Sequence, residues 1–177
     1  ADIRIMPGPG AVLEEVARIR DEKTAAGHTV YTIPVGGSSP VGALGYVAAA
    51  QEFVEQTHAA GLDVDAIVVT TGSCTTHAGL LTGLEIAGRT EAVQGMSIWR
   101  TAKAATELVR EKAADILELV GRNDLDVTEK VHVSGDYVGG GYGEPTEAML
   151  EAVQLLSRLE GLLLDPVYTG KTMSGLI

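Results

Sequence analysis

The segment Ala66–Leu81, AIVVTTGSCTTHAGLL, decides the fold of this chain. An apolar, β-branched run from Ala66 to Thr71 leads into Gly72, then into small hydroxyl residues, and an apolar helical pattern follows from Thr76. A glycine permits a tight turn, and a helix that begins after it offers unpaired backbone N–H groups to an anion. The segment therefore predicts a buried strand, an anion-binding turn and a helix. An ordinary turn with Thr76 as the helix N-cap is an equal alternative.

The rest of the chain repeats this alternation of strand and helix patterns. Further strands are predicted at Val30–Val35, Ala92–Trp99 and Val131–Val133. Helices are predicted at about Ala11–Ala26, Gly42–Ala60, Thr76–Ala87, Thr101–Val120 and Thr146–Leu156. Strands that alternate with helices of this length favour an α/β fold, in which helices flank a parallel sheet. Glycines gather after the strands, where such sheets bind their ligands.

The two ends of the chain resemble interrupted elements. Ile3–Met6 is a strand-like run at the start, and Lys171–Ile177 reads as the first turns of a helix. We therefore expect the chain to be part of a longer protein.

Composition excludes several classes of function. The net charge is −11, with 13 basic and 24 acidic residues, which opposes the phosphate contacts that nucleic-acid binding needs. Cys74 is the only cysteine, and no Cys/His cluster has zinc-ligand spacing, so we expect neither a disulfide nor a metal site. No apolar run is long enough to cross a membrane, and we expect a cytoplasmic protein.

Within the deciding segment, TGSCTTHAGL resembles the phosphate-binding loop of fold-type-II pyridoxal-phosphate enzymes, written G-S-G-G-T with H-A-G-L following. It does not match the Walker or G-x-G-x-x-G nucleotide patterns. The resemblance is to the D-cysteine desulfhydrase and 1-aminocyclopropane-1-carboxylate (ACC) deaminase family, and it implies an α/β fold of the tryptophan-synthase-β type. It assigns the cofactor phosphate to Gly72, Ser73, Cys74, Thr75 and Thr76. Cys74 and Thr75 stand where the family often has glycine.

Two further blocks extend the resemblance. IPVGGSSPVGALGYVAAAQE, residues 33–52, is similar to the family segment that joins a strand to a long helix beside the cofactor. GYGEPTEAMLEAVQLLSRLEGLLLDPVYTGKTMSGLI, residues 141–177, is similar to the G-Y-G-x-P and L-L-D-P-V-Y-T-G-K segments. The resemblance implies that Tyr168 is an acid/base or positioning group, that Tyr142 lines the substrate pocket and that Thr169 bonds the pyridine nitrogen. Without it, each tyrosine would be interpreted as a half-buried core residue.

Other chemically suggestive residues receive ordinary interpretations. His77, in the first turn of a helix, is predicted to pack or cap, and Cys74 is predicted to be a small loop residue rather than a nucleophile. The family holds its cofactor as a Schiff base on a lysine of an N-terminal K-R-D-D-L or G-G-N-K type of segment, which nothing here resembles. Lys171 does not correspond to that lysine and is predicted to be solvated, and the chain's other lysines lie in contexts that are exposed or unrelated to that segment.

The residue after Tyr168 bears on the reaction. ACC deaminases carry Y-E-G-K, whereas this chain has Thr169, a neutral hydroxyl that leaves the cofactor a weaker electron sink. This favours β-elimination of D-cysteine or a related β-substituted amino acid to pyruvate, ammonia and sulfide. L-cysteate sulfo-lyase and ACC deaminase activities are the alternatives. A sulfonate would need an additional cation, for which Arg100 is a candidate. Family members are commonly homodimers, which the resemblance implies here too.

An alternative of another class is a catalytically incomplete fragment or a non-catalytic domain that binds phosphate ligands. On the resemblance, residues 1–177 are mostly the larger cofactor-binding domain, with an incomplete smaller domain. The lysine segment and the family's C-terminal T-G-G segment are expected to lie outside the chain.

Overall fold

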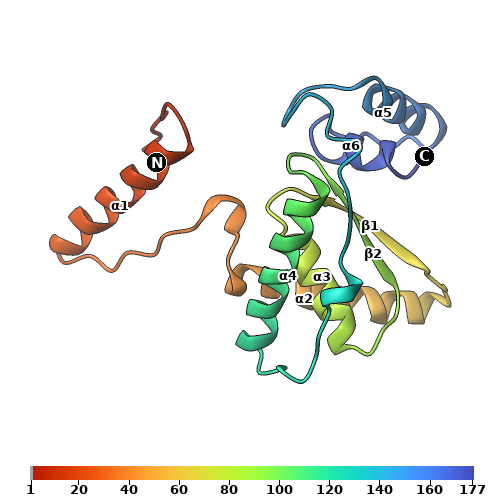
Figure 1. Ribbon diagram of the computed structural model, residues 1–177, viewed down its shortest axis with the longest axis horizontal. Coiled ribbons are helices and arrows are strands. Elements are labelled where there is room, and N and C mark those ends of the chain that lie inside the picture. Colours follow the sequence, from red (N-terminus) through yellow and green to blue (C-terminus); the bar gives the residue numbers. More distant parts are fainter. Residues whose placement is uncertain (1) are drawn as a thin grey trace. The chain divides into compact units, whose positions relative to one another are not determined.

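The computed structural model describes residues 2–177, without the side chain of Pro9. The chain divides into two compact units, Ala1–Val35 and Gly36–Ile177. Figure 1 shows the order of the elements along the chain. No helix described over residues 2–177 is long and apolar enough to cross a membrane.

The first unit is built around one helix, α1 (Pro9–Ala25). Arg18 pairs with Glu15 at 2.7 Å and with Glu22 at 2.8 Å, spacings that place all three side chains on one helix face. The strands predicted at Ile3–Met6 and Val30–Val35 are not formed, which corrects both predictions. A β-branched run becomes a strand only when a neighbour accepts its backbone hydrogen bonds, and no described strand pairs with either run.

The second unit contains a parallel three-stranded sheet in the order β1-β2-β3. The strands are β1 (Ala66–Thr71), β2 (Ala92–Ser97) and β3 (His132–Ser134). Ala66 lies beside Ala92, and Gln94 lies beside His132. The three corresponding sequence predictions, and with them the α/β parallel-sheet fold, are confirmed.

Helices connect and cover these strands. They are α2 (Pro40–Ala60), α3 (Thr75–Ile86), α4 (Ala102–Leu119), α5 (Glu147–Leu159) and α6 (Thr169–Ser174), with short 3-10 turns at η1 (Val35–Gly37) and η2 (Thr128–Lys130). α3 links β1 to β2, and α4 lies on the path from β2 to β3, which is the crossover that parallel strands require. α2, α3 and α4 pack against one another.

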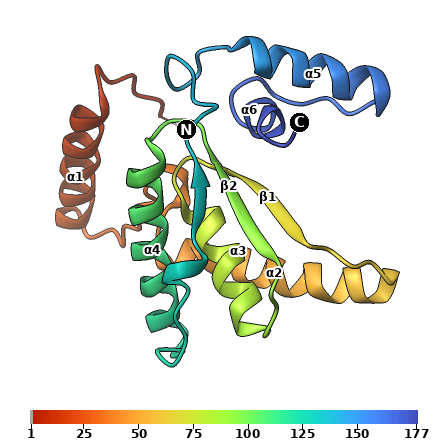
Figure 2. The same ribbon diagram turned by 45° about the vertical axis from the view of Figure 1, so that its right-hand side comes forward.

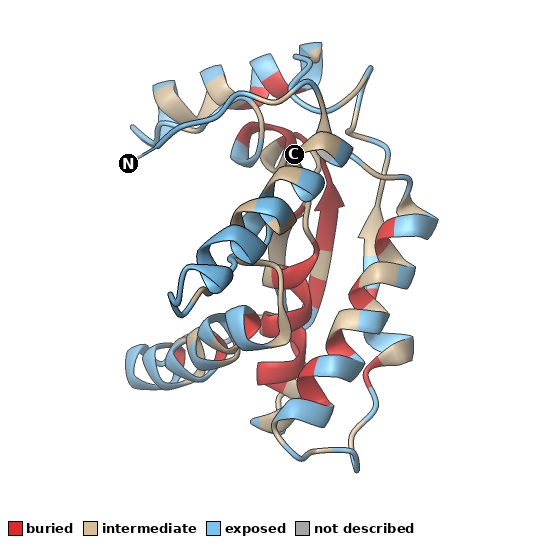
Figure 3. Ribbon diagram, turned by 90° about the vertical axis from the view of Figure 1, so that its left-hand side faces the viewer, coloured by how far each residue is buried: buried red, intermediate tan, exposed pale blue. Residues whose placement is uncertain are grey.

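The core lies where α3 meets β2 and the neighbouring helices. Ala78, Leu84, Val93, Val109 and Ile116 are buried there. Figure 3 shows the buried residues concentrated on the central helix and strands. In Figure 2, the arrow of β3 points toward the end of the sheet at which α5 and α6 lie. α6 packs against β1 and β2, so the last part of the chain closes one end of the sheet.

Candidate functional site

The turn between β1 and α3 has a backbone geometry that only its tertiary setting explains. Cys74 occupies the N-cap position of α3 with φ 69°, a left-handed conformation that is uncommon for a residue other than glycine. The helix thus begins at Thr75, and the alternative that makes Thr76 the N-cap is wrong. The first backbone N–H groups of α3 lack partners within the helix and carry the positive end of its dipole. This arrangement suits an anionic group.

The side chains of Cys74 and Thr75 point away from that anion position. Cys74 is 2% exposed, and its Sγ lies 3.9 Å from the carbonyl oxygen of Ala105. Burial raises the pKa of its thiol, against the opposing charges of Arg100 and Lys112. Thr75 is buried, and its hydroxyl lies 2.5 Å from the hydroxyl of Ser38. Both side chains anchor the turn, which leaves its backbone to bind a ligand.

The Gly36–Pro40 segment reaches this same turn. Ser39 caps α2, since its side chain accepts a hydrogen bond of 3.0 Å from the N–H of Gly42. A Cβ on Gly36 would lie only 3.3 Å from the Cβ of Ser73, so glycine permits the close approach. The two blocks that resemble one family therefore meet in space.

A cavity of about 480 Å³ lies between β1 and α6. It is lined by Tyr46, Val68, Val69, Thr70, Gly72, Ser73, Thr76, Leu164, Tyr168, Thr169, Thr172, Met173 and Leu176. Gly72, Ser73 and Thr76 from the turn and Tyr168 and Thr169 from the C-terminal block are predicted site residues that share this wall. Cys74, Thr75 and Tyr142 do not line it. Its volume falls in the range of roughly 300–1,000 Å³ that small-molecule sites occupy.

Tyr142 stands just outside the cavity wall and acts on it through Tyr168. The two phenol oxygens share a hydrogen bond, and the rings meet edge to face with centroids 6.0 Å apart. This hydrogen bond raises the pKa of Tyr168, and burial and the charges of Tyr142 and Asp165 raise it further. Tyr168 is thus protonated at neutral pH and can donate a hydrogen bond or a proton into the cavity.

Thr169 is held by Asp165. The Thr169 hydroxyl donates to Oδ1 of Asp165 at 2.7 Å and accepts from the backbone N–H of Asp165 at 2.9 Å. Desolvation acts to raise the pKa of Asp165, but hydrogen bonds from Thr169 and from two backbone N–H groups outweigh it and lower the pKa to about 2. Thr169 therefore presents a neutral hydroxyl beside a carboxylate that stays ionised.

Three residues to which the family resemblance gave no role contact the site residues. Arg100 donates from Nη1 to the carbonyl oxygen of Gly72 at 2.6 Å, and its guanidinium lies 4.2 Å from the ring centroid of Trp99. Trp99 in turn lies 6.1 Å from the ring of Tyr142. Thr172 places its hydroxyl 2.5 Å from that of Thr70 on β1. Arg100 was predicted only as a possible sulfonate contact, and no local pattern marks the other two.

Two residues set aside on sequence grounds have different outcomes. His77 is fully buried, its Nδ1 lies 3.1 Å from the Thr71 hydroxyl, and burial lowers its pKa to about 4, so the packing interpretation is confirmed. Lys171 was predicted to be solvated, and this is wrong. It is 0% exposed, and its Nζ donates to the carbonyl oxygens of Val138 and Gly141. Its partners are distant in sequence, so helix-start position alone misplaces it.

The donor set of the cavity fits an elongated ligand with a phosphate at one end. The N-terminal turn of α3 with Ser73 and Thr76 suits the phosphate, and Thr169 lies on the same cavity wall with its hydroxyl hydrogen donated to Asp165. No described residue that lines the cavity is a lysine.

Comparison with known proteins agrees with this donor set. The family model described as pyridoxal-phosphate-dependent enzyme matches residues 1–177. The crystal structure of an ACC deaminase homologue superposes with a TM-score of 0.87 at 32% sequence identity. The match covers 98% of this chain and 52% of that one, so the chain spans about half the length of that relative. From its fold, its cavity and this match, the chain belongs to the family of pyridoxal-phosphate-dependent enzymes.

Proposed function

We propose that the protein catalyses the pyridoxal-phosphate-dependent β-elimination of D-cysteine or a related β-substituted amino acid. With D-cysteine, the substrate and one water molecule yield pyruvate, ammonia and hydrogen sulfide. The bound cofactor supplies an electron sink that stabilises the negative charge left on Cα. The protein's own residues bind the cofactor, set the strength of that sink and manage the proton at the leaving group.

The neutral hydroxyl of Thr169 is the observation that carries the proposal. It lines the cavity beside Tyr168, where the Y-E-G-K pattern would place a carboxylate. A hydroxyl cannot hold a ring nitrogen protonated as a carboxylate can, so the sink is weaker. A weaker sink is sufficient when a good leaving group departs from Cβ, and it disfavours the opening of an unactivated ring. This supports elimination over ring opening.

The tyrosine pair provides the proton chemistry. Tyr168 faces the cavity, and its raised pKa keeps it protonated. A protonated phenol can donate to the departing sulfur, and Tyr142 can then share its proton through the hydrogen bond between the two oxygens. The turn residues Ser73 and Thr76 orient the cofactor phosphate at the other end of the cavity.

The family alternatives differ in their support. The 32% identity to an ACC deaminase homologue favours ring opening, but Thr169 opposes it. A sulfonate leaving group would call for a cation in the cavity. Arg100 instead donates a hydrogen bond from Nη1 to the Gly72 carbonyl oxygen and does not line the cavity. This weakens the case for an L-cysteate sulfo-lyase.

A second candidate is a polypeptide that binds the cofactor phosphate without turnover. The positions of three lysines favour it. Lys103 is an exposed side chain, Lys130 pairs with Glu85, and Lys171 directs its Nζ to two backbone carbonyls. Binding through the turn between β1 and α3 requires no lysine.

The proposal includes the assembly and compartment implied by the family resemblance, a cytoplasmic homodimer. Analytical ultracentrifugation of the full-length protein tests the assembly. A sedimentation mass of a single chain would rule out the dimer.

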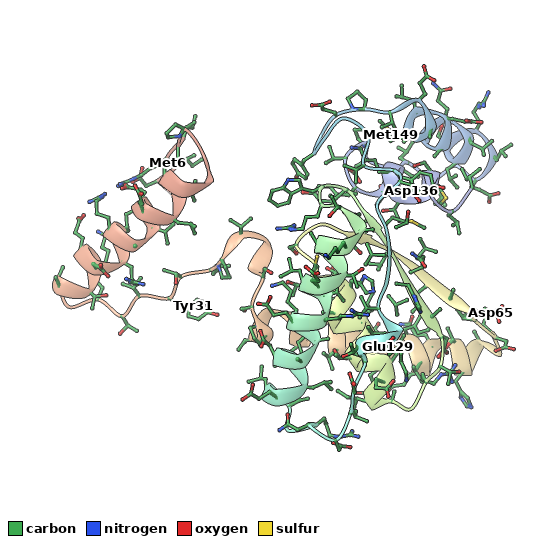
Figure 4. The ribbon with its side chains drawn as sticks, viewed as in Figure 1. Met6, Tyr31, Asp65, Glu129, Asp136 and Met149 are labelled. Atoms are coloured by element: carbon green, nitrogen blue, oxygen red, sulfur yellow. The ribbon has the colours of Figure 1, made fainter. Side chains whose placement is uncertain are left out.

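The decisive experiment follows cofactor and products together. The full-length protein is loaded with pyridoxal phosphate, its visible absorbance is recorded before and after D-cysteine is added, and sulfide and pyruvate are assayed. Elimination predicts a spectral change with equal amounts of sulfide and pyruvate. Tyr168→Phe should lower the turnover by about 100-fold or more, the usual contribution of a general acid. Tyr31→Phe, at the exposed tyrosine labelled in Figure 4, is the matched control and should leave turnover unchanged.

The other outcomes identify the alternatives. Turnover of aminocyclopropane carboxylate without sulfide release from D-cysteine would establish ring opening. Sulfite release from L-cysteate would establish the sulfo-lyase. Bound cofactor with none of these products would establish the binding-only candidate.

A further inference from the structure

Lys171 is a fully buried side chain that the proposed chemistry leaves without a role. It is 0% exposed, and its Nζ donates hydrogen bonds to Val138 O at 2.6 Å and to Gly141 O at 2.8 Å. No salt bridge to it is present among residues 2–177. Burying an amino group is costly unless its N–H donors find acceptors. The carbonyl oxygens of Val138 and Gly141 are the acceptors here.

Both carbonyls belong to the glycine-rich loop that carries Tyr142. Gly139 and Gly143 have φ values of 71° and 78°, a region that glycine enters without steric cost. Such a loop has little conformational preference of its own. The bond to Gly141 O lies one residue before Tyr142, so it fixes the backbone from which the tyrosine projects.

The helix that carries Lys171 also carries residues of the cavity wall. Lys171 lies in α6, directly after the segment that presents Tyr168 and Thr169 to the cavity. α6 packs closely against α5. A Cβ on Gly170 would lie only 3.0 Å from Cγ of Met149, the buried α5 residue labelled in Figure 4. One side chain thus joins the loop of Tyr142 to a firmly packed helix.

We propose that Lys171 is a positioning residue that holds Tyr142 in hydrogen-bonding contact with Tyr168 by clamping the carbonyls of Val138 and Gly141. It does not touch the cavity itself. The inference rests on the proposed function only for the consequence, since the tyrosine pair is the proton relay of that proposal. The clamp itself is a property of the fold and is measurable without substrate.

Lys171→Met tests the clamp because methionine nearly preserves the length of the side chain and removes its donors. The reporter is Trp99, the chain's only tryptophan, whose ring lies 6.1 Å from that of Tyr142. Release of the loop should shift Trp99 emission and increase its quenching by acrylamide. Hydrogen exchange of the backbone amide of Glu144, which donates to the carbonyl oxygen of Gly141 at 3.3 Å, should accelerate by about tenfold as the loop is released. Lys103→Met, at a lysine whose side chain is 86% exposed, is the matched control and should change neither signal.

Two measurements separate positioning from a general contribution to stability. In the first, the effects of Lys171→Met and Tyr142→Phe on kcat/KM are combined in a double-mutant cycle. If Lys171 acts through Tyr142, the lysine substitution has little further effect once the hydroxyl of Tyr142 is gone. In the second, Lys171→Ala is supplied with n-propylammonium, which replaces the missing chain and its amino group. Propylammonium should restore Trp99 emission, and 1-propanol should not.

The inference is overturned if folded Lys171→Met retains wild-type emission and exchange, or if the cycle is additive. Should the methionine variant not fold, Lys171→Ala folded in the presence of n-propylammonium takes its place, and withdrawal of the amine should then release the loop. Unfolding of both variants would assign Lys171 a purely structural role instead. If the wild-type protein does not turn over D-cysteine while Lys171→Met clearly releases the loop, the proposed reaction is refuted and the clamp stands.

Discussion

At the scale of residues, the site is shaped by side chains whose surroundings override their usual behaviour. Cys74 adopts a left-handed backbone that glycine would take more easily, and Lys171 is buried although lysines are usually solvated. Asp165 holds the start of α6 with a carboxylate whose pKa is lowered to about 2. Each of these residues positions another group, so each can be tested through stability or pH as well as through activity.

The backbone of Cys74 yields the first prediction. Cys74→Gly should change the free energy of unfolding by less than about 1 kcal/mol, because relief of the left-handed strain offsets the lost burial of a small side chain. Cys74→Val should destabilise by about 2–3 kcal/mol, since a β-branched residue is strained at φ 69° and overfills a buried site. Urea denaturation of both variants measures the difference. Equal stabilities for the two would contradict the strain argument.

Asp165 yields the second prediction, which depends on pH. Its side chain accepts hydrogen bonds from the backbone N–H groups of Val167, Tyr168 and Thr169, so Asp165→Ala should cost about 1 kcal/mol near neutral pH. A lowered folded-state pKa means that the carboxylate stabilises fully above the unfolded value and loses its effect as pH falls through about 2. Thermal melts of wild type and variant should therefore converge in strong acid. A difference that is independent of pH would show that charge is not involved.

At the scale of elements, local signals placed the helices well. Ser39, Thr101 and Thr146 cap α2, α4 and α5 through their side-chain oxygens, as serine and threonine commonly do. Strands were harder to locate, because Val30–Val35 has the same β-branched character as β1 but no pairing partner. The close packing of α3 against α2 depends on glycines whose role no local pattern reveals.

Those glycines yield the third prediction. A Cβ on Gly83 would come within 2.6 Å of the Cβ of Ala50 and 2.7 Å of the carbonyl oxygen of Val47. Gly83→Ala should therefore destabilise the protein by about 1–3 kcal/mol through overpacking between α3 and α2. Gly45 on α2 meets nothing within 4 Å, so Gly45→Ala should instead stabilise by about 0.5–1 kcal/mol. Chemical denaturation of the pair gives opposite signs if the helices pack as described, and the same sign otherwise.

At the scale of the whole molecule, the cavity is made by chain segments that are far apart in sequence. The Thr70–Thr172 contact joins β1 to α6 across 102 residues. It brings the turn after β1 and the C-terminal block to one wall of the cavity, so the proposed cofactor binding and proton transfer both require the docking of α6 against the sheet.

The fourth prediction belongs to this scale because Thr169 is proposed to link cofactor binding to the reaction. Thr169→Val removes the hydroxyl with little change in shape and should lower sulfide release from D-cysteine by about tenfold, the equivalent of one lost hydrogen bond in the site. Thr169→Ser retains the hydroxyl and serves as the matched control. Both are measured as kcat/KM for sulfide with saturating cofactor. An active valine variant would show that Thr169 does not tune the reaction.

The sequence by itself determined the class of fold, because strand and helix periodicity and N-cap residues are local properties that survive any tertiary arrangement. It also identified the turn after β1 and the Tyr168–Thr169 pair through a resemblance to one family. Tertiary structure alone decided that Cys74 and Thr75 face away from the cavity, that Lys171 is buried against the loop of Tyr142, and that Ile3–Met6 and Val30–Val35 form no strand. Side-chain direction, burial and strand pairing all depend on partners distant along the chain, and local sequence carries no record of those partners.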